Sequence, residues 1–117
     1  MKLKTRTDYR VLRHRRLRQK IAGTAARPRM CVSLSGKHIR IQFIDDVAAV
    51  TLAAVSTESK ELAGNNNRAT AQRLGAKAAE VALAKGIRTA VFDRGGHAYG
   101  GRVAAIAAAA RAAGMTL

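Results

Sequence analysis

Apolar and polar residues alternate in two short runs, residues 30–34 and 39–43. Every second side chain in these runs is hydrophobic, and the apolar positions are Met30, Val32, Leu34, Ile39, Ile41 and Phe43. A period of two predicts strands that bury one face and leave the other face polar. Between the runs, residues 35–37 read Ser-Gly-Lys, which is typical of a tight turn, so we expect the two strands to pair antiparallel.

A third apolar run covers residues 47–55, and Val50 and Leu52 are its strongest hydrophobic positions. The run follows Asp45 and Asp46, a pair that we expect to form a turn, because Asp side chains accept hydrogen bonds from the backbone beside them. Three strands joined by short turns make an antiparallel meander.

Beyond residue 67 the apolar period changes from two to between three and four. The hydrophobic positions Ala71, Leu74, Ala78, Val81 and Ala82 fall on one face of a helix. The asparagines at residues 65–67 offer an N-cap, and Lys85-Gly86 is a typical C-terminal stop. The sequence therefore predicts a helix between these two signals.

After this helix, Thr89–Phe92 predicts a short buried strand, and a glycine-rich loop leads to a second helix from about Arg102 to Ala113. Gly114 should close that helix, and its inner face should carry Val103, Ile106, Ala107 and Ala110. A strand that follows a helical crossover joins the sheet parallel to an earlier strand. We therefore predict an α/β fold, in which a mixed sheet of the meander plus one parallel strand packs against two helices.

Positive charge is concentrated at the start of the chain. The first 29 positions hold eleven basic residues and one acidic residue, Asp8, and carry +10 of the formal net charge of +15. The basic residues are Lys2, Lys4, Arg6, Arg10, Arg13, Arg15, Arg16, Arg18, Lys20, Arg27 and Arg29. Such a segment repels itself and needs a dense polyanion, of which RNA and DNA are the commonest. We therefore divide the chain into a basic RNA-binding arm, residues 1–27, and an α/β RNA-binding domain, residues 28–117.

Within the arm, Thr7–Ile21 could form a helix that has a weak apolar stripe between its arginines. We expect this helix to be stable only against RNA or against the domain. Arginine outnumbers lysine by fifteen to seven in the chain. Because guanidinium groups fork onto phosphate oxygens and stack on bases, this bias favours a structured nucleic acid as the partner.

The glycine-rich loop before the second predicted helix carries side chains that suit RNA. We expect contacts from Arg94, Gly95, Gly96, His97, Tyr99, Gly101 and Arg102. Glycines let backbone N–H groups face outward. The arginines can form paired hydrogen bonds, the histidine can gain or lose a proton as a donor, and the tyrosine ring can stack on a base. The polar face of the second strand, with His38, Arg40 and Gln42, is another candidate surface.

Two other functional classes stay open at this point. A metal-dependent nuclease would need three or four carboxylates at one end of the sheet. The candidates are Asp45, Asp46, Asp93, Glu58, Glu61 and Glu80. A general DNA-compacting protein would not be expected to confine its charge to one arm before a specific glycine-arginine-tyrosine loop.

The sequence points away from cofactor chemistry. The histidines show no metal-ligand spacing, Cys31 stands alone, and neither a Walker nor a Rossmann pattern is present. We therefore expect no catalytic residue, no metal, no cofactor and no small-molecule substrate. No apolar leader or span is visible, so we expect a cytosolic protein without membrane contact.

An ordered set of short motifs resembles a known family. The motifs are Arg27-Pro28-Arg29-Met30, His38-Ile39 with Gln42, Ile44-Asp45-Asp46, Thr51-Leu52, Ser56-Thr57, Phe92-Asp93-Arg94-Gly95-Gly96 and Gly101-Arg102-Val103. Together with the basic arm they resemble the eighteenth large-subunit ribosomal protein of bacteria, a family that binds 5S ribosomal RNA. The resemblance covers essentially the whole chain in order. Arg40 stands where the family often has an aromatic residue, and Gly100 where it often has histidine.

The resemblance implies an α/β fold of the general kind seen in ribonuclease H, without enzyme activity. It implies a cytoplasmic component of the large ribosomal subunit, in the central protuberance, where the protein fastens 5S RNA to 23S RNA beside neighbouring ribosomal proteins. In that family the basic extension, the sheet face and the glycine-rich loop meet RNA. Matched onto this chain, these regions are the arm Lys2–Arg29, then His38, Arg40 and Gln42, and then residues 94–102.

Overall fold

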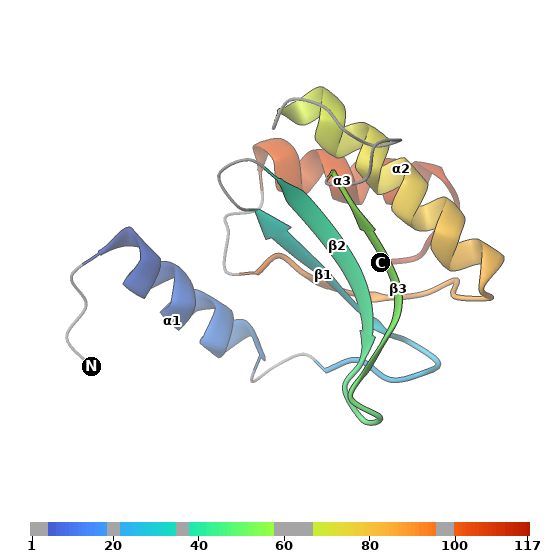
Figure 1. The fold of residues 1–117 in the computed structure, drawn as a ribbon, viewed down its shortest axis with the longest axis horizontal. Coiled ribbons are helices and arrows are strands. Elements are labelled where there is room, and N and C mark those ends of the chain that lie inside the picture. Colours follow the sequence, from blue (N-terminus) through green and yellow to red (C-terminus); the bar gives the residue numbers. More distant parts are fainter. Residues whose placement is uncertain (1–4, 19–21, 35–37, 58–66, 96–99) are drawn as a thin grey trace.

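The computed structural model describes residues 5–18, 22–34, 38–57, 67–95 and 100–117. Figure 1 shows a sheet packed against two helices, with a third helix at the start of the chain. The elements in chain order are α1 (Arg6–Arg18), β1 (Arg29–Leu34), β2 (Ile39–Asp45), β3 (Val50–Ser56), α2 (Arg68–Ala84), β4 (Val91–Asp93) and α3 (Gly101–Ala112).

The four strands form one mixed sheet with the order β3-β2-β1-β4. β1 pairs antiparallel with β2, and β2 pairs antiparallel with β3, which confirms the predicted meander. β4 joins the outer side of β1 in parallel, as expected for a strand that follows the α2 crossover. The predicted α/β class with two helices packed on a mixed sheet is therefore confirmed.

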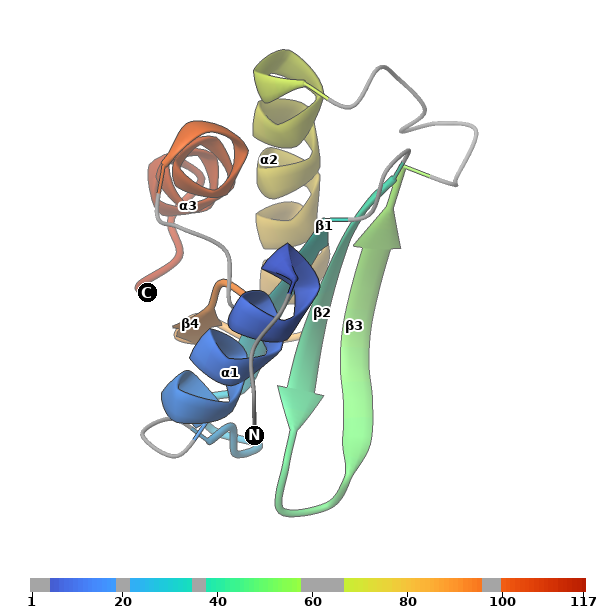
Figure 2. The ribbon, with the colours of Figure 1, turned by 90° about the vertical axis from the view of Figure 1, so that its left-hand side faces the viewer.

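The two faces of the sheet have different covers. α2 and α3 lie over one face (Figures 1 and 2). The alternating apolar side chains of that face are buried in one core with residues of both helices. The largest of the fully buried side chains there include Phe43, Met30, Ile39 and Ile41. α1 stands to one side of the sheet, outside the layer of α2 and α3 (Figure 1), and its His14 side chain reaches Asp93 at the end of β4. On the opposite face, in the part formed by β2 and β3, Arg40, Gln42 and Ala54 are exposed, and none of the helices in the described ranges covers them; we call this part the open sheet face.

Small residues let α2 and α3 pack closely. Gly75 of α2 faces the α3 backbone, and a Cβ atom at that position would lie 2.6 Å from the carbonyl oxygen of Ile106. Ala78 and Ala107 are also fully buried. The small residues on the facing sides of α2 and α3 therefore allow a short distance between the two helix axes.

The boundaries of α2 and the end of α3 follow the predicted signals. Asn67 is the N-cap of α2, and its side chain accepts a hydrogen bond from the Thr70 backbone N–H. α2 ends before Lys85, and Gly86 follows with a left-handed φ of 82°. Gly114, with a φ of 111°, follows α3. The inner face predicted for α3 is buried at all four positions.

The third strand differs from its prediction. Val50 is 46% exposed and Leu52 is half-buried, whereas Ala53, at 4% exposed, is the buried position of β3. β3 also pairs irregularly with β2 between Phe43 and Ile44, where β3 holds one extra residue. An inserted residue interrupts the alternation of inward and outward side chains, and Val50 and Leu52, predicted as the strongest apolar positions, are less buried than Ala53.

The short strand after α2 also begins later than predicted. β4 starts at Val91, and Thr89 forms only an isolated parallel bridge with Thr116 at the end of the chain.

None of the helices in the described ranges is long and apolar enough to span a bilayer.

Candidate nucleic-acid interface

The basic arm contains the helix α1, and Thr5 and Asp8 cap its N-terminus together. The Asp8 backbone N–H donates to the Thr5 hydroxyl at 3.1 Å, and the Thr5 N–H donates to the Asp8 carboxylate at 3.3 Å. This reciprocal pair is a capping box. The prediction of a helix over Thr7–Ile21 missed this start, although the Thr-x-x-Asp spacing is readable in the sequence.

Most of the predicted arm cations on α1 face solvent. Arg6, Arg13, Arg15 and Arg16 are exposed, while Arg10 and Arg18 are half-buried. Arg27, in the connection to β1, is exposed as well. The predicted contacts Lys2, Lys4 and Lys20 lie outside the described residues. α1 therefore presents four exposed arginine side chains on one helix of 13 residues.

Arg29 has a different position, although it was predicted as an RNA contact with the others. It is 8% exposed. Its Nη1 donates to Oδ2 of Asp93 at 2.6 Å, and its Nε and Nη2 donate to Asp46 at 3.1 and 3.2 Å. The planar fork thus joins the turn after β2 to the end of β4. The structure gives this guanidinium an intramolecular role.

Two residues of α1 reach the same two carboxylates. His14 Nε2 lies 3.0 Å from Oδ2 of Asp93, and Arg18 Nη1 lies 3.2 Å from Oδ2 of Asp46. The backbone N–H of Gly23 also donates to Oδ2 of Asp46, at 2.6 Å. We call the five residues His14, Arg18, Arg29, Asp46 and Asp93 the arm-anchor cluster. It connects α1 to the sheet.

Gly23 fits this place because it has no side chain. A Cβ atom there would lie 2.2 Å from the Ile44 carbonyl oxygen and 2.3 Å from the Arg29 backbone nitrogen. The chain therefore passes directly against β1 and β2 before it enters the sheet. The sequence had shown this glycine only as part of a break between arm and domain.

The acids of the cluster are held in their ionised form. The hydrogen bond from Arg29 is the main reason that the pKa of Asp46 lies well below its usual range. Burial raises the pKa of Asp93, but hydrogen bonds from His14, the Gly95 N–H and Arg29 together bring it below its usual value. Burial also acts to lower the pKa of Arg29, and its bonds to both aspartates reverse this effect.

The two turn aspartates turn out to have separate roles. Asp45 accepts hydrogen bonds from the backbone N–H groups of Val47 and Ala48, at 3.0 and 3.2 Å, which confirms the predicted turn chemistry. Asp46 was predicted to do the same, and that prediction is wrong. Its carboxylate instead receives Arg18, Gly23 and Arg29, since it points from the turn back toward β1.

The open face of the sheet brings two predicted contacts together. Arg40 and Gln42 are exposed at alternate positions of β2, and Arg40 pairs in register with Ser33 of β1 and Ser56 of β3. A shallow pocket of about 150 Å³ is lined here by Arg40, Gln42, Ala54, Val55 and Ser56. His38 is half-buried, with its Nδ1 3.3 Å from the Thr57 hydroxyl.

The glycine-rich loop is described only at its two ends. Arg94 and Arg102 are half-buried and Gly101 is exposed, while Gly96, His97 and Tyr99 lie outside the described residues. The Gly95 N–H was predicted to face outward. It donates instead to Oδ1 of Asp93 at 2.9 Å, and the residue is buried with a left-handed φ of 65°. Asp93 recruits this N–H because an Asp side chain readily bonds the backbone two residues ahead.

The carboxylates described in the structure do not form a nuclease site. Asp45 caps a turn, Asp46 and Asp93 are bound by Arg29, and Glu80 lies on α2, on the far side of the sheet. Glu58 and Glu61 lie outside the described ranges. Two-metal chemistry needs carboxylates that are free to bind cations, and the bound guanidinium opposes this at both aspartates.

One group in the described part of the chain has metal-binding side chains close together, namely His14, Cys31 and Asp93, whose ligand atoms lie within 4.8 Å of one another. Arg29 donates to the same Asp93 oxygen that His14 contacts. Burial raises the pKa of the Cys31 thiol, and the charge of Asp93 raises it further. A protonated thiol beside a guanidinium does not suit a cation, so the group fits hydrogen bonding better than metal binding.

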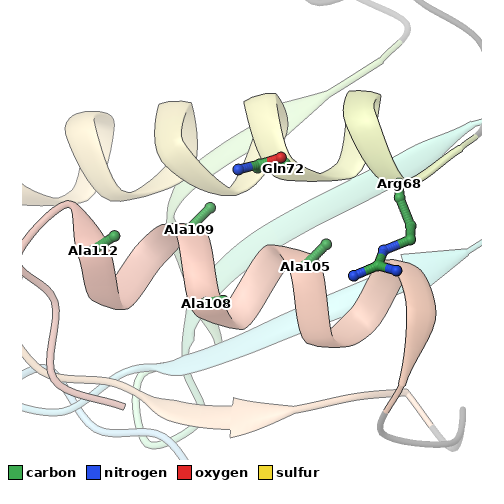
Figure 3. A pocket seen from close by; sticks show the side chains of 6 residues that line it. All are labelled: Arg68, Gln72, Ala105, Ala108, Ala109 and Ala112. Atoms are coloured by element: carbon green, nitrogen blue, oxygen red, sulfur yellow. The ribbon is translucent and has the colours of Figure 1, made fainter.

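A second hollow lies on the helical layer, away from the open sheet face. It has a volume of about 330 Å³ and is lined by Arg68, Gln72, Ala105, Ala108, Ala109 and Ala112 (Figure 3). Figure 3 shows the alanine side chains along α3 and Arg68 at one end of the groove. None of these residues was among the predicted contacts.

Comparison with known proteins gives a consistent picture. Residues 4–117 match the family described as ribosomal L18 of archaea, bacteria, mitochondria and chloroplasts. The chain is 52% identical over 112 residues to the large ribosomal subunit protein uL18 of Clostridium novyi (strain NT), covering 94% of this chain and 93% of that protein. It is 53% identical over 105 residues to the protein of the same name from an Exiguobacterium species, covering 88% of each.

Proposed function

This chain belongs to the ribosomal L18 family, and we propose that it binds 5S ribosomal RNA and helps attach it to 23S ribosomal RNA in the central protuberance. As a member of this family it is a structural component of the large ribosomal subunit in the cytoplasm, and it is not an enzyme. The proposal concerns the finer assignment, which is the identity of the RNA and the surfaces that meet it.

The observation that carries the proposal is that α1 and the open sheet face both expose basic side chains. α1 presents the exposed side chains of Arg6, Arg13, Arg15 and Arg16. The open sheet face presents Arg40 and Gln42. The two aspartates of the sheet that α1 reaches, Asp46 and Asp93, are bound by Arg29, and Asp8 within α1 takes part in the capping box with Thr5. The result is a positively charged surface made by α1 together with the open sheet face.

We assign different tasks to the two parts of this surface. The α1 arginines neutralise phosphates and release counterions, a term that depends on salt and little on sequence. Arg40 and Gln42 stand on a rigid strand, where a guanidinium can stack or pair with phosphate and an amide can bond a ribose or a base edge. Capture by the helix is thus combined with shape recognition by the sheet.

The partially described glycine-rich loop contributes a further contact in this proposal. Arg94 and Arg102 flank it, one after β4 and the other in the first turn of α3. Among the described residues, no side chain caps the start of α3 at Gly100. Backbone N–H groups at a helix start favour phosphate oxygens, so this end of the domain suits an RNA backbone.

The direct test is a titration of the full chain against a 5S RNA transcript and against a transfer RNA at the same salt concentration. We expect tighter binding to 5S RNA, and Arg40→Ala should weaken that binding more than Arg88→Ala. Arg88 is an exposed cation between α2 and β4, so its removal is matched in charge. Equal affinity for both RNAs, or equal effects of the two variants, would contradict the proposal.

A further inference from the structure

The arm-anchor cluster contains a part that belongs to the domain alone. Arg29 joins Asp46 to Asp93 through three donor atoms, and Asp93 is fully buried. A buried guanidinium with two ionised partners gives a rigid set of acceptors, because each group fixes the orientation of the others. Both carboxylates still accept additional bonds from outside this core.

The additional bonds come from one face of α1. His14 and Arg18 are four residues apart, so they project from the same side of the helix, and they reach Asp93 and Asp46 respectively. Arg15 and Arg16 contact neither aspartate in the structure and are exposed. α1 therefore has an anchoring face and a solvent face, although its sequence is arginine-rich all round.

We propose that Asp46 and Asp93 are positioning residues for RNA binding, which hold α1 through Arg18 and His14 and so fix its exposed arginines relative to the open sheet face before RNA arrives. This inference rests on the proposed RNA-binding function. It assigns Arg18 and His14 to anchoring the helix, and it leaves phosphate contact to the arginines on the solvent face.

The physical gain is preorganisation. A loose basic arm must be ordered when it binds, and the apparent affinity falls by the fraction of molecules in which the arm is correctly placed. If loss of the anchor left about one molecule in ten with α1 docked, apparent binding would weaken about tenfold. A charge that merely touches phosphate would act differently, through the number of counterions released.

The test compares two variants of the full chain with the same loss of formal charge. His14→Ala combined with Arg18→Ala removes both anchors but leaves the Arg29 pairs with Asp46 and Asp93 intact. Arg15→Ala removes one exposed cation from the same helix. Circular dichroism and urea unfolding of the domain check that both variants keep the wild-type fold.

The first readout is the backbone amide order parameter of α1 in the free protein. We expect wild type and Arg15→Ala to give values near those of the sheet, about 0.85. In the anchor variant the α1 values should fall below about 0.6 while the sheet is unchanged. Restoring the donors as His14→Gln with Arg18→Lys should return much of the order. Unchanged α1 order in the anchor variant would overturn the proposal.

The second readout is the salt dependence of binding to a 5S RNA transcript. The anchor variant should bind about tenfold more weakly with the wild-type slope of log K against log salt concentration. Arg15→Ala should make that negative slope shallower by about 0.9, because one fewer phosphate is neutralised. A slope that becomes shallower in the anchor variant as it does in Arg15→Ala would show that Arg18 touches phosphate, and the proposal would be wrong.

The two hypotheses can fail separately. If wild type shows no preference for 5S RNA, the proposed function fails, but the order parameters of the free protein still test whether Asp46 and Asp93 hold α1. If 5S binding is specific and α1 is equally ordered in both variants, only the positioning role is refuted.

Discussion

Arg15 and Arg29 belong to the same basic segment and carry the same side chain, yet the fold gives them opposite environments. Arg15 lies on the exposed side of α1, whereas Arg29 is enclosed at the start of β1 between Asp46 and Asp93. The exposed guanidinium is available to an external anion. The enclosed one organises the protein itself. Charge density in a sequence therefore indicates a polyanion partner without indicating which cations meet it.

The difference follows from where the acids lie. Few of the chain's acidic residues are near the arm, and the structure brings Asp46 and Asp93 to one place from distant parts of the sequence. Arg29 occupies a strand position that faces both, since it opens β1 between β2 and β4. Helix α1 reaches these acids through only one of its sides. The arginines on its other sides are left for RNA in the proposed function.

The largest effect should come from removing the enclosed cation. Arg29→Ala leaves two carboxylates without their main partner, so we expect a loss of about 3–5 kcal/mol in the free energy of unfolding. Arg15→Ala should change that free energy by less than about 0.5 kcal/mol. Urea unfolding followed by circular dichroism measures both. Similar losses for the two variants would remove the distinction between the two arginines.

A smaller effect should come from the glycine that closes the arm-anchor cluster. Gly23→Ser would place a side chain against the Ile44 carbonyl oxygen and the Arg29 backbone, so we expect a loss of about 1–3 kcal/mol. The same replacement at Gly100 meets open space and supplies an N-cap hydroxyl to α3, so Gly100→Ser should be neutral or slightly stabilising. Thermal unfolding of both variants decides this, and equal shifts in Tm would contradict the close approach at Gly23.

Acid should weaken the same cluster. The pKa values of Asp46 and Asp93 are lower in the folded state than in the unfolded chain, so protons bind preferentially to the unfolded form. The stability that these carboxylates contribute is then fully present above about pH 5 and is lost as pH falls through and below pH 4. We therefore expect the free energy of unfolding to decrease between pH 6 and pH 3.

The measurement is urea unfolding at pH 6 and at pH 3 for wild type and for Asp46→Asn. The variant begins from a lower stability and should lose less between the two pH values, because one of the two titrating groups is gone. An identical pH dependence in both proteins would show that Asp46 does not contribute to acid sensitivity.

The smallest free-energy change should come from removing an exposed arginine of α1. Arg16→Ala should leave unfolding unchanged and weaken 5S RNA binding by about 0.2–1 kcal/mol at moderate salt, as expected for an exposed charge. Its clearest signature is a decrease of about 0.9 in the steepness of the fall of log K with log salt concentration. Arg88→Ala is the matched control, since it removes an exposed cation outside the proposed surface. If both variants changed the slope equally, α1 would not be the specific site of counterion release.

Much of the fold could be predicted from local pattern. The alternating residues of β1 and β2, the asparagine cap of α2 and the inner face of α3 all report short-range geometry, and the structure confirms each of them. The facing of β3 could not be predicted in this way. Its pairing irregularity depends on how β3 meets β2, and the hydrophobicity of residues 47–55 carries no sign of it.

The candidate site was predictable in composition and less so in role. Arg40 and Gln42 share an open strand face because alternate positions of a strand must point to the same side. The sequence could not separate Arg29 from the arginines around it, nor Asp46 from Asp45. Those distinctions depend on partners that are distant along the chain.

By itself the sequence determined the order of the strands and helices, the concentration of positive charge at the start of the chain, and a polyanion as the expected partner. These properties depend on residue period, turn chemistry and net charge, which are local or additive quantities. Only the tertiary structure decided which cations face outward and how α1 is attached. That outcome depends on Asp46 and Asp93 meeting Arg29 across the sheet, because a hydrogen bond requires atoms within about 3 Å whatever their separation in sequence.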